Sequence, residues 1–305
     1  MAGAPRDPEE LTASAAAAPP TAAIAARTRM GAVRLTVADL ERSIAYYRDA
    51  IGLVELRRFE GGVALGAAGG VEVLVLEEVP GAVPADGYPG LYHFALLLPA
   101  RTDLARFLAH AARERVPLVG LSDHFVSEAI YLRDPDHHGI EIYWDRPRAT
   151  WEGKVGQMGT WPLDVEALLG SLPDPASEPF EGLAGGTVMG HVHLRAADVL
   201  ATIAFYRDVL GFELMAQLGA QAAFLAAGGY HHHLGANTWE TRRTDAAPVG
   251  TARLQEVTIV LPDAAEHERV VAQLNAAGSV GAETPDGAVL VHDPSGIALR
   301  LAVEG

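Results

Sequence analysis

Short stretches of alternating apolar and polar residues recur along the chain, and each is followed by a segment with helical spacing. The first alternating stretch covers residues 30–37 and predicts a β-strand. Further on, Ile44, Tyr47 and Ile51 are spaced so that they share one face of a helix. Short runs rich in Gly and Val then have strand character as far as residue 78. The pattern therefore predicts one βαβββ unit over residues 30–78.

The same unit is repeated later in the chain. Without gaps, 12 of the 24 residues from position 30 to position 53 are identical to the residues 159 positions later. In the two copies Asp39 and Asp198 stand where a side chain can accept hydrogen bonds from the open amides of a helix start. Gly52 and Gly211 fit the left-handed residue that ends such a helix. A weaker copy follows each strong one, which predicts four βαβββ modules, over residues 30–78, 90–146, 187–241 and 252–303.

The modules form two halves joined by a linker. Residues 1–28 are rich in Ala and Pro and lack the early positive charge of a secretory signal, which favours a disordered tail. A short helix is expected in the linker near residues 163–169. The expected organisation is a tail over residues 1–28, modules one and two over 29–146, the linker over 147–186, and modules three and four over 187–305.

Bulk composition excludes several classes of function. With 305 residues, 49% of them hydrophobic and 20% charged, the chain can form two domains with substantial cores. Its formal net charge of −16 argues against a nucleic-acid partner. No apolar run reaches about 18 residues, so no membrane span is expected. The absence of Cys excludes disulfides and thiolate ligands. We expect a cytoplasmic location, and the composition leaves homo-oligomer formation open.

Three residues in separate stretches have the character of metal ligands. His93 and His191 lie in apolar, strand-like runs at corresponding positions of modules two and three. Glu141 lies between Ile140 and Ile142, where burying a carboxylate without a cation would be costly. Two imidazoles and one carboxylate are the ligands of a facial iron(II) site with open positions. We predict a metal site on these three residues, occupied by Fe(II) or Mn(II).

The distribution of these ligands predicts which modules pair. Module one has Ala32 where module three has its histidine, and module four has Glu256 and Ala298 where module two has its histidine and glutamate. Pairing neighbours within each half would leave the ligands apart, whereas pairing module two with module three collects all three. We therefore expect an α+β fold of two curved mixed sheets, each built from two modules, with the helices outside.

A segment around the predicted ligand Glu resembles a known family. It reads Asp123-His124-Phe125-Val126-Ser127, then Tyr131, Pro135 and Gly139-Ile140-Glu141. Extradiol dioxygenases have a similar Asp-His-x-Val-Ser segment, followed by a Tyr ten residues before the ligand Glu with a Pro between them. Residues 28–303 thus resemble the vicinal-oxygen-chelate superfamily of glyoxalase I, bleomycin-resistance proteins and extradiol dioxygenases, and are most similar to bacterial catechol 2,3-dioxygenases. The chain departs from the usual extradiol pattern, in which all three ligands come from the C-terminal pair of modules.

This resemblance implies a reaction and assigns roles to further residues. It implies cleavage of a catechol ring beside its two hydroxyls, with both atoms of O2 incorporated. Tyr131 and His124 would be hydrogen-bond donors to the substrate oxygens. A histidine of the run 231–233 would act as the base, since extradiol enzymes have a His-His pair in the corresponding strand.

The histidine run allows more than one assignment. If it lies in a strand, His231 and His233 point to one face and His232 to the other. His232 is the closest match to the base, and His231 and His233 are then substrate-binding residues. A surface tract that binds metal adventitiously is the alternative. His193 shares a face with the predicted ligand His191 and is expected to line the substrate pocket.

Two other functions compete with ring cleavage. A glyoxalase-type isomerase or lyase would ordinarily use a fourth protein ligand, a Gln or Glu on a facing strand, where module three has histidines instead. A non-enzymatic drug-binding protein would use the concave sheets to sequester its ligand. Such a protein needs no metal ligands, so that His93, Glu141 and His191 would have no explanation.

Overall fold

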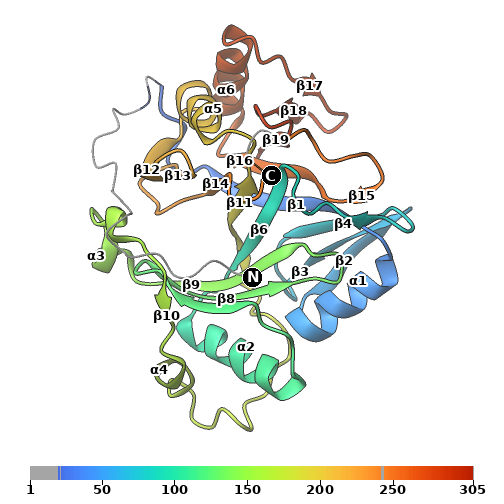
Figure 1. The fold of residues 1–305 in the computed structure, drawn as a ribbon, viewed down its shortest axis with the longest axis vertical. Coiled ribbons are helices and arrows are strands. Elements are labelled where there is room, and N and C mark those ends of the chain that lie inside the picture. Colours follow the sequence, from blue (N-terminus) through green and yellow to red (C-terminus); the bar gives the residue numbers. More distant parts are fainter. Residues whose placement is uncertain (1–19, 21, 242–243, 305) are drawn as a thin grey trace.

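Two large curved β-sheets with helices on their outer faces form the protein in the computed structural model (Figure 1). The structure describes residue 20 and residues 22–241 and 244–304. Within these residues one sheet has eight strands and the other nine, and β5 (Val83–Pro84) forms a small separate pair with β15 (Thr251–Ala252). The predicted α+β fold class is confirmed.

Four modules with the same order of elements supply the strands of the two sheets. Module one contains β1 (Arg29–Val37), α1 (Leu40–Tyr46), a π-helical turn (Tyr47–Ile51), β2 (Val54–Phe59), β3 (Gly62–Gly66) and β4 (Leu74–Glu78). Module two contains β6 (Gly90–Leu97), α2 (Arg101–Glu114), β7 (Gly120–Asp123), β8 (Ser127–Arg133) and β9 (Gly139–Asp145). Module three contains β11 (Val188–Arg195), α5 (Val199–Ile203), a π-helical turn (Ala204–Val209), β12 (Glu213–Leu218), β13 (Ala222–Ala226) and β14 (Leu234–Asn237). Module four contains β16 (Leu254–Leu261), α6 (Ala264–Ala276), β17 (Ala282–Glu283), β18 (Val289–His292) and β19 (Ala298–Val303).

The two sheets are built from modules of opposite halves. In each module the first strand pairs in parallel with the last, as β6 does with β9 and β11 with β14. Modules two and three join through the antiparallel pair β6–β11, and modules one and four through β1–β16. The predicted pairing of module two with module three is confirmed.

A continuous hydrophobic core includes the first strand of every module. It contains Val33, Phe94, Val192 and Val257, one from each of β1, β6, β11 and β16, and all four are fully buried. Full burial of such a side chain contributes about 1.5–3 kcal/mol relative to its exposure. The core therefore holds the central strands of both sheets in place.

Local signals in the sequence explain the first helix of the repeated modules. Asp39 accepts a hydrogen bond from the Arg42 amide at 3.0 Å, as expected for a helix cap. Gly52 has a φ of 89° and ends the helix in the predicted left-handed conformation. One difference from the prediction is that the last turn is π-helical, because the Gly52 amide bonds to the Tyr47 carbonyl five residues earlier.

A buried Asp before the last strand of modules two and four links each of them to the module that precedes it. In module four, Asp293 accepts hydrogen bonds from the amides of Ser295 at 2.8 Å and Ile297 at 2.9 Å and from the Tyr206 hydroxyl at 3.2 Å. Asp134 makes the corresponding contact with the Tyr47 hydroxyl at 2.9 Å. These bonds join modules of one half that lie in different sheets.

The linker between the two halves contains short helices and a short strand. The linker includes α3 (Arg148–Trp151), a 3-10 turn (Val155–Gln157), β10 (Trp161–Pro162) and α4 (Val165–Leu169). The last of these is the short helix predicted there.

The prediction of a disordered tail over residues 1–28 is wrong for part of this range. Ile24 is buried, and its amide donates to the Gly211 carbonyl at 2.9 Å. Ile24 and Thr28 are therefore packed in the fold, and residues 1–19 and 21 of the expected tail lie outside the described residues. Among the residues that the structure does describe, none of the helices is both long and apolar enough to cross a membrane.

Replacing Asp293 with Ala should destabilise the fold without removing any group of the predicted metal site. The change leaves two backbone amides and one buried hydroxyl without their acceptor, and we expect a loss of about 3 kcal/mol in the free energy of unfolding. Urea denaturation measures this loss. Asp286→Ala, which removes an exposed partner of Arg300 and of the Thr284 hydroxyl, should leave the midpoint nearly unchanged; equal midpoints for both variants would contradict the structural role of Asp293.

Candidate metal centre

Three adjacent strands place the predicted metal ligands on one face of the nine-stranded sheet. β6 lies between β9 and β11. Ala95 of β6 pairs with Glu141 on one side and with His191 on the other. His93 precedes Ala95 by two residues, so that its side chain leaves the strand on the same face. The strand pairing therefore brings together three residues that are far apart in the sequence.

Small residues leave the space in which these ligands meet. Ala95 stands between Glu141 and His191 and adds only a methyl group to the row. A side chain at Gly139 would have its Cβ 2.0 Å from the Tyr92 carbonyl oxygen. The Gly of the Gly-x-Glu segment thus allows β9 to lie close to β6 beside His93.

The ligand atoms converge on a common point. The Nε2 atoms of His93 and His191 lie 3.0 Å and 3.1 Å from the same oxygen, Oε2 of Glu141. Two ligand atoms that are each about 2.1 Å from an octahedral ion, at right angles to one another, are about 3.0 Å apart. His93 Nε2 is buried without a hydrogen-bond partner despite this proximity. The three residues therefore fit a divalent metal ion that they would hold from one side.

Burial and mutual attraction set the charges of this group. Burial alone would raise the pKa of the Glu141 carboxyl, but the attraction of His191 and the polar contacts with both histidines hold that pKa well below its usual range. Burial lowers the pKa of His191. A carboxylate beside a neutral His191 is the protonation state that metal binding requires of these two groups.

Tyr131 and His124 form a hydrogen-bonded pair next to the metal ligands. Tyr131 pairs with Glu141 across β8 and β9, and its hydroxyl lies 2.7 Å from Nε2 of His124. Nδ1 of His124 is 2.6 Å from the Gly159 carbonyl oxygen in the linker and donates to it. Burial and the negative charge of Glu141 raise the pKa of Tyr131 well above its usual value, so that the hydroxyl keeps its proton.

His193 lies in an aromatic wall beside the ligands. It pairs with His93 across β6 and β11, and the two rings are 5.0 Å apart. Tyr92 is the extra residue of a bulge at this point, and its ring is 5.2 Å from that of His193. Phe224 and Trp239 contact the other sides of His193. These contacts place His193 beside the predicted ligands, and its role in a substrate pocket stays a prediction.

The histidine run 231–233 lies before β14 and not in it. Gly228 and Gly229 have φ angles of 60° and 66°, which turn the chain after β13. The strand therefore begins only at Leu234. The predicted strand placement of the histidine run is wrong, because the two glycines prolong the turn.

The three histidines of this run have different surroundings. The His232 ring lies 4.1 Å from the His191 ring, and burial together with neighbouring imidazoles lowers the pKa of His232 well below its usual value. His231 is fully buried and has both ring nitrogens within hydrogen-bond distance of protein groups. His233 uses Nδ1 to accept the Ala227 amide at 3.1 Å, and burial lowers its pKa to about 3. Of the three, His232 lies nearest to a predicted ligand, whereas the ring of His231 is 6.2 Å from that of His191.

Sequence reasoning missed a group of residues behind the histidine run. Asp145 lies 2.7 Å from both His231 Nε2 and the Tyr230 hydroxyl, and Tyr230 is 2.9 Å from the Tyr143 hydroxyl. Strand alternation offered a signal, because Tyr143 and Asp145 follow Glu141 at steps of two residues. No feature of the sequence indicated that Trp151 of the linker would pack on His231.

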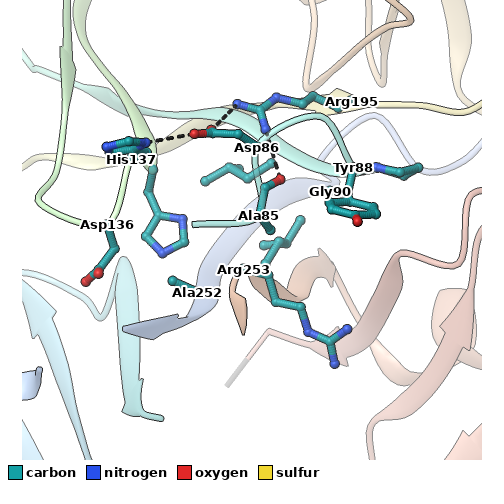
Figure 2. A pocket seen from close by; sticks show the side chains of 13 residues that line it. Ala85, Asp86, Tyr88, Gly90, Asp136, His137, Arg195, Ala252 and Arg253 are labelled. Atoms are coloured by element: carbon teal, nitrogen blue, oxygen red, sulfur yellow. Dashed lines mark hydrogen bonds and ion pairs between the residues drawn. The ribbon is translucent and has the colours of Figure 1, made fainter. Parts of the chain in front are cut away.

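A separate polar hollow lies outside this group (Figure 2). Asp86 lies between His137 and Arg195 in Figure 2, 2.8 Å from Nδ1 of His137 and 3.8 Å from the Arg195 guanidinium. Arg195 also approaches Glu240 at 3.5 Å. The residues lining the hollow include none of the predicted site residues.

Comparisons with known proteins point to one family. A family described as the glyoxalase/bleomycin resistance protein/dioxygenase superfamily matches residues 29–142 and 188–301. A catechol-2,3-dioxygenase of Bacillus subtilis (strain 168) is 41% identical to this chain over 273 residues, which are 88% of this chain and 94% of the relative.

Solved structures share the fold at much lower identity. A Bacillus subtilis protein described provisionally as a dioxygenase superposes with a TM-score of 0.64 at 14% identity, over 92% of this chain and 86% of its own. Glyoxalase I from Zea mays superposes with a TM-score of 0.53 at 17% identity, over 90% of this chain and 92% of its own. These two similarities concern the fold alone.

Replacing Glu141 with Ala should abolish stoichiometric metal retention, because it removes the only anionic member of the group. Elemental analysis after loading with Fe(II) or Mn(II) and dialysis measures the metal content per chain. Glu152→Ala, in the exposed part of the linker, should retain about as much metal as the unchanged protein. Full occupancy in Glu141→Ala would show that the ion binds elsewhere.

Proposed function

Since this chain belongs to the glyoxalase/bleomycin resistance protein/dioxygenase superfamily, we propose that it is an extradiol dioxygenase. In this proposal it opens the ring of a catechol beside its two hydroxyls, using O2 and a non-haem Fe(II) held by His93, Glu141 and His191. The relative that is 41% identical over most of both chains has the name of such an enzyme. The convergence of two imidazoles on one carboxylate oxygen is the structural observation that supports the proposal most directly.

The ligand set suits a reaction that needs several open metal positions. Three protein ligands on one face leave room for the two catechol oxygens and O2. Bound iron(II) would acidify the coordinated diol and supply the electron transfer to O2. Holding both reactants at one point is itself a large part of such catalysis. The contribution of the protein is then to bind, orient and deprotonate the catechol around this point.

His232 is the best-placed base. Its ring contacts the ring of His191, so that a catechol oxygen bound beside that ligand would be within its reach. Burial holds the pKa of His232 well below its usual value, so that the imidazole is neutral near pH 7 and has an unprotonated ring nitrogen. Of the alternatives left by the sequence, His231 has both ring nitrogens engaged by protein groups, and His233 has its Nδ1 engaged by the Ala227 amide.

Tyr131 would stabilise charge on a substrate oxygen, and His124 would hold the Tyr131 hydroxyl in position. The Tyr131 hydroxyl keeps its proton and lies across the strand pair from Glu141. Because His124 donates to the Gly159 carbonyl through Nδ1, its Nε2 accepts from Tyr131 and fixes the hydroxyl in place. When a substrate oxygen binds, the hydroxyl would turn this hydrogen from His124 to that oxygen, and a donor placed in this way lowers the energy of a developing negative charge.

The proposed activity is tested by comparing catechol turnover with and without O2. After anaerobic loading with Fe(II), the protein should consume O2 and form a yellow ring-cleavage product from catechol or a substituted catechol. Equal product formation in the absence of O2, or no O2 uptake with any catechol at full iron content, would refute the proposal. Manganese in place of iron serves as the comparison for metal identity.

Replacing His232 with Ala should lower kcat by about 10²–10⁴-fold, because one positioned acid–base group is lost. Iron content and substrate affinity should change little, since His232 is not one of the three predicted ligands. Steady-state kinetics at matched iron content measures the effect. His233→Ala is the matched control, with a nearly unchanged kcat expected. A larger loss of kcat in His233→Ala than in His232→Ala would show that His232 is not the base.

A further inference from the structure

We propose that Asp145 and His231 are positioning residues that fix the ring orientation and tautomer of His232. The inference rests on the proposed function, in which His232 takes a proton from the substrate. Neither residue is one of the three predicted metal ligands; the sequence predicted substrate binding for His231 and no role for Asp145.

A chain of hydrogen bonds leads from the carboxylate to the base. Oδ1 of Asp145 lies 2.7 Å from Nε2 of His231. Nδ1 of His231 lies 2.9 Å from Nδ1 of His232. All three side chains are therefore connected, and each imidazole is held through a defined nitrogen.

The direction of these bonds follows from the chemistry of the groups. An ionised carboxylate only accepts hydrogen bonds, so that Nε2 of His231 must carry a hydrogen. In neutral His231 the other nitrogen, Nδ1, then has a free lone pair and accepts from Nδ1 of His232. Nε2 of His232 is left as the unprotonated nitrogen. The chain therefore selects the tautomer in which His232 can accept a proton through Nε2.

Asp145 is itself held in place by two tyrosines. The Tyr230 hydroxyl donates to Oδ2 of Asp145 at 2.7 Å. Because that hydrogen is used, Tyr230 accepts from the Tyr143 hydroxyl at 2.9 Å. A side chain at Gly190 would place its Cβ 1.8 Å from the Tyr143 oxygen, so that the glycine immediately before the ligand His191 provides the space for this hydroxyl.

The linker closes the chain off from solvent. Trp151 packs edge-on to His231 with ring centroids 5.6 Å apart, and its indole nitrogen donates to the Arg146 carbonyl at 2.8 Å. His231 has no exposed surface. Water therefore does not compete for its ring nitrogens, and the orientation of His232 depends on Asp145.

Asp145→Asn tests the proposal with almost no change in shape. If the Tyr230 hydroxyl keeps the amide oxygen as its acceptor, the amide NH2 group faces His231 and donates to Nε2. The tautomers of His231 and His232 then reverse, and Nε2 of His232 carries the hydrogen. We expect kcat to fall about 10- to 1,000-fold, with iron content and KM little changed.

The tautomer is read independently of activity. Nitrogen-15 NMR of histidine side chains in the full-length, Zn(II)-loaded protein distinguishes protonated from unprotonated ring nitrogens, and the spectrum of His232→Gln assigns the His232 signals. We expect an unprotonated Nε2 in the unchanged protein and a protonated one in Asp145→Asn. Glu152→Gln, the same carboxylate-to-amide change on the exposed linker, should alter neither the tautomer nor kcat.

The possible outcomes separate this inference from the proposed function. A protonated Nε2 in the unchanged protein, an unaltered tautomer in Asp145→Asn, or a normal kcat for that variant would overturn the positioning role. Loss of iron in Asp145→Asn would also count against it, because the defect would then lie in metal retention. Full turnover by His232→Ala would instead refute His232 as the base, whatever the NMR spectra show.

Discussion

The antiparallel pairing of β6 with β11 is the constraint on which the site depends. It sets His93 and His191 on one face, with Ala95 between His191 and the strand that contributes Glu141. If this pairing slipped by one residue, the side chains of one of the two strands would turn to the opposite face of the sheet. The two imidazoles and the carboxylate would then no longer meet. Helices, linker and the second sheet can vary in detail, but none of them can replace this register.

Buried carboxylates in this protein are satisfied in two different ways. Asp293 accepts two backbone amides and a hydroxyl, which neutralises much of the cost of burying it. Glu141 is as deeply buried but faces two imidazoles, and one of these, His93, has a nitrogen without a hydrogen-bond partner. Asp293 therefore needs no further partner. At Glu141 and His93 a cation would supply the interactions that the protein groups leave unmade.

Much of this arrangement could be predicted from the sequence, and the exceptions have physical causes. The repeat gave the modules, and the unequal distribution of His93, Glu141 and His191 over them gave the cross-half pairing. The histidine run was misplaced because two glycines in left-handed conformations delay β14, and a strand pattern does not reveal a prolonged turn. Asp145, Tyr230 and Trp151 come together only through the tertiary structure. The N-terminal segment looked disordered by composition, yet Ile24 is buried against module three.

The cross-half pairing also has a consequence for biosynthesis. β6 and β11 are separated by fewer than half as many residues as β1 and β16, in which Arg29 pairs with Val260. As the chain leaves the ribosome, the nine-stranded sheet can therefore assemble while β1 is still without its antiparallel partner. Until module four is synthesised, one edge of β1 offers unpaired backbone groups to other strands. Distant pairing of this kind slows folding, so that the period of greatest exposure to aggregation falls between the synthesis of module one and the synthesis of the last strands.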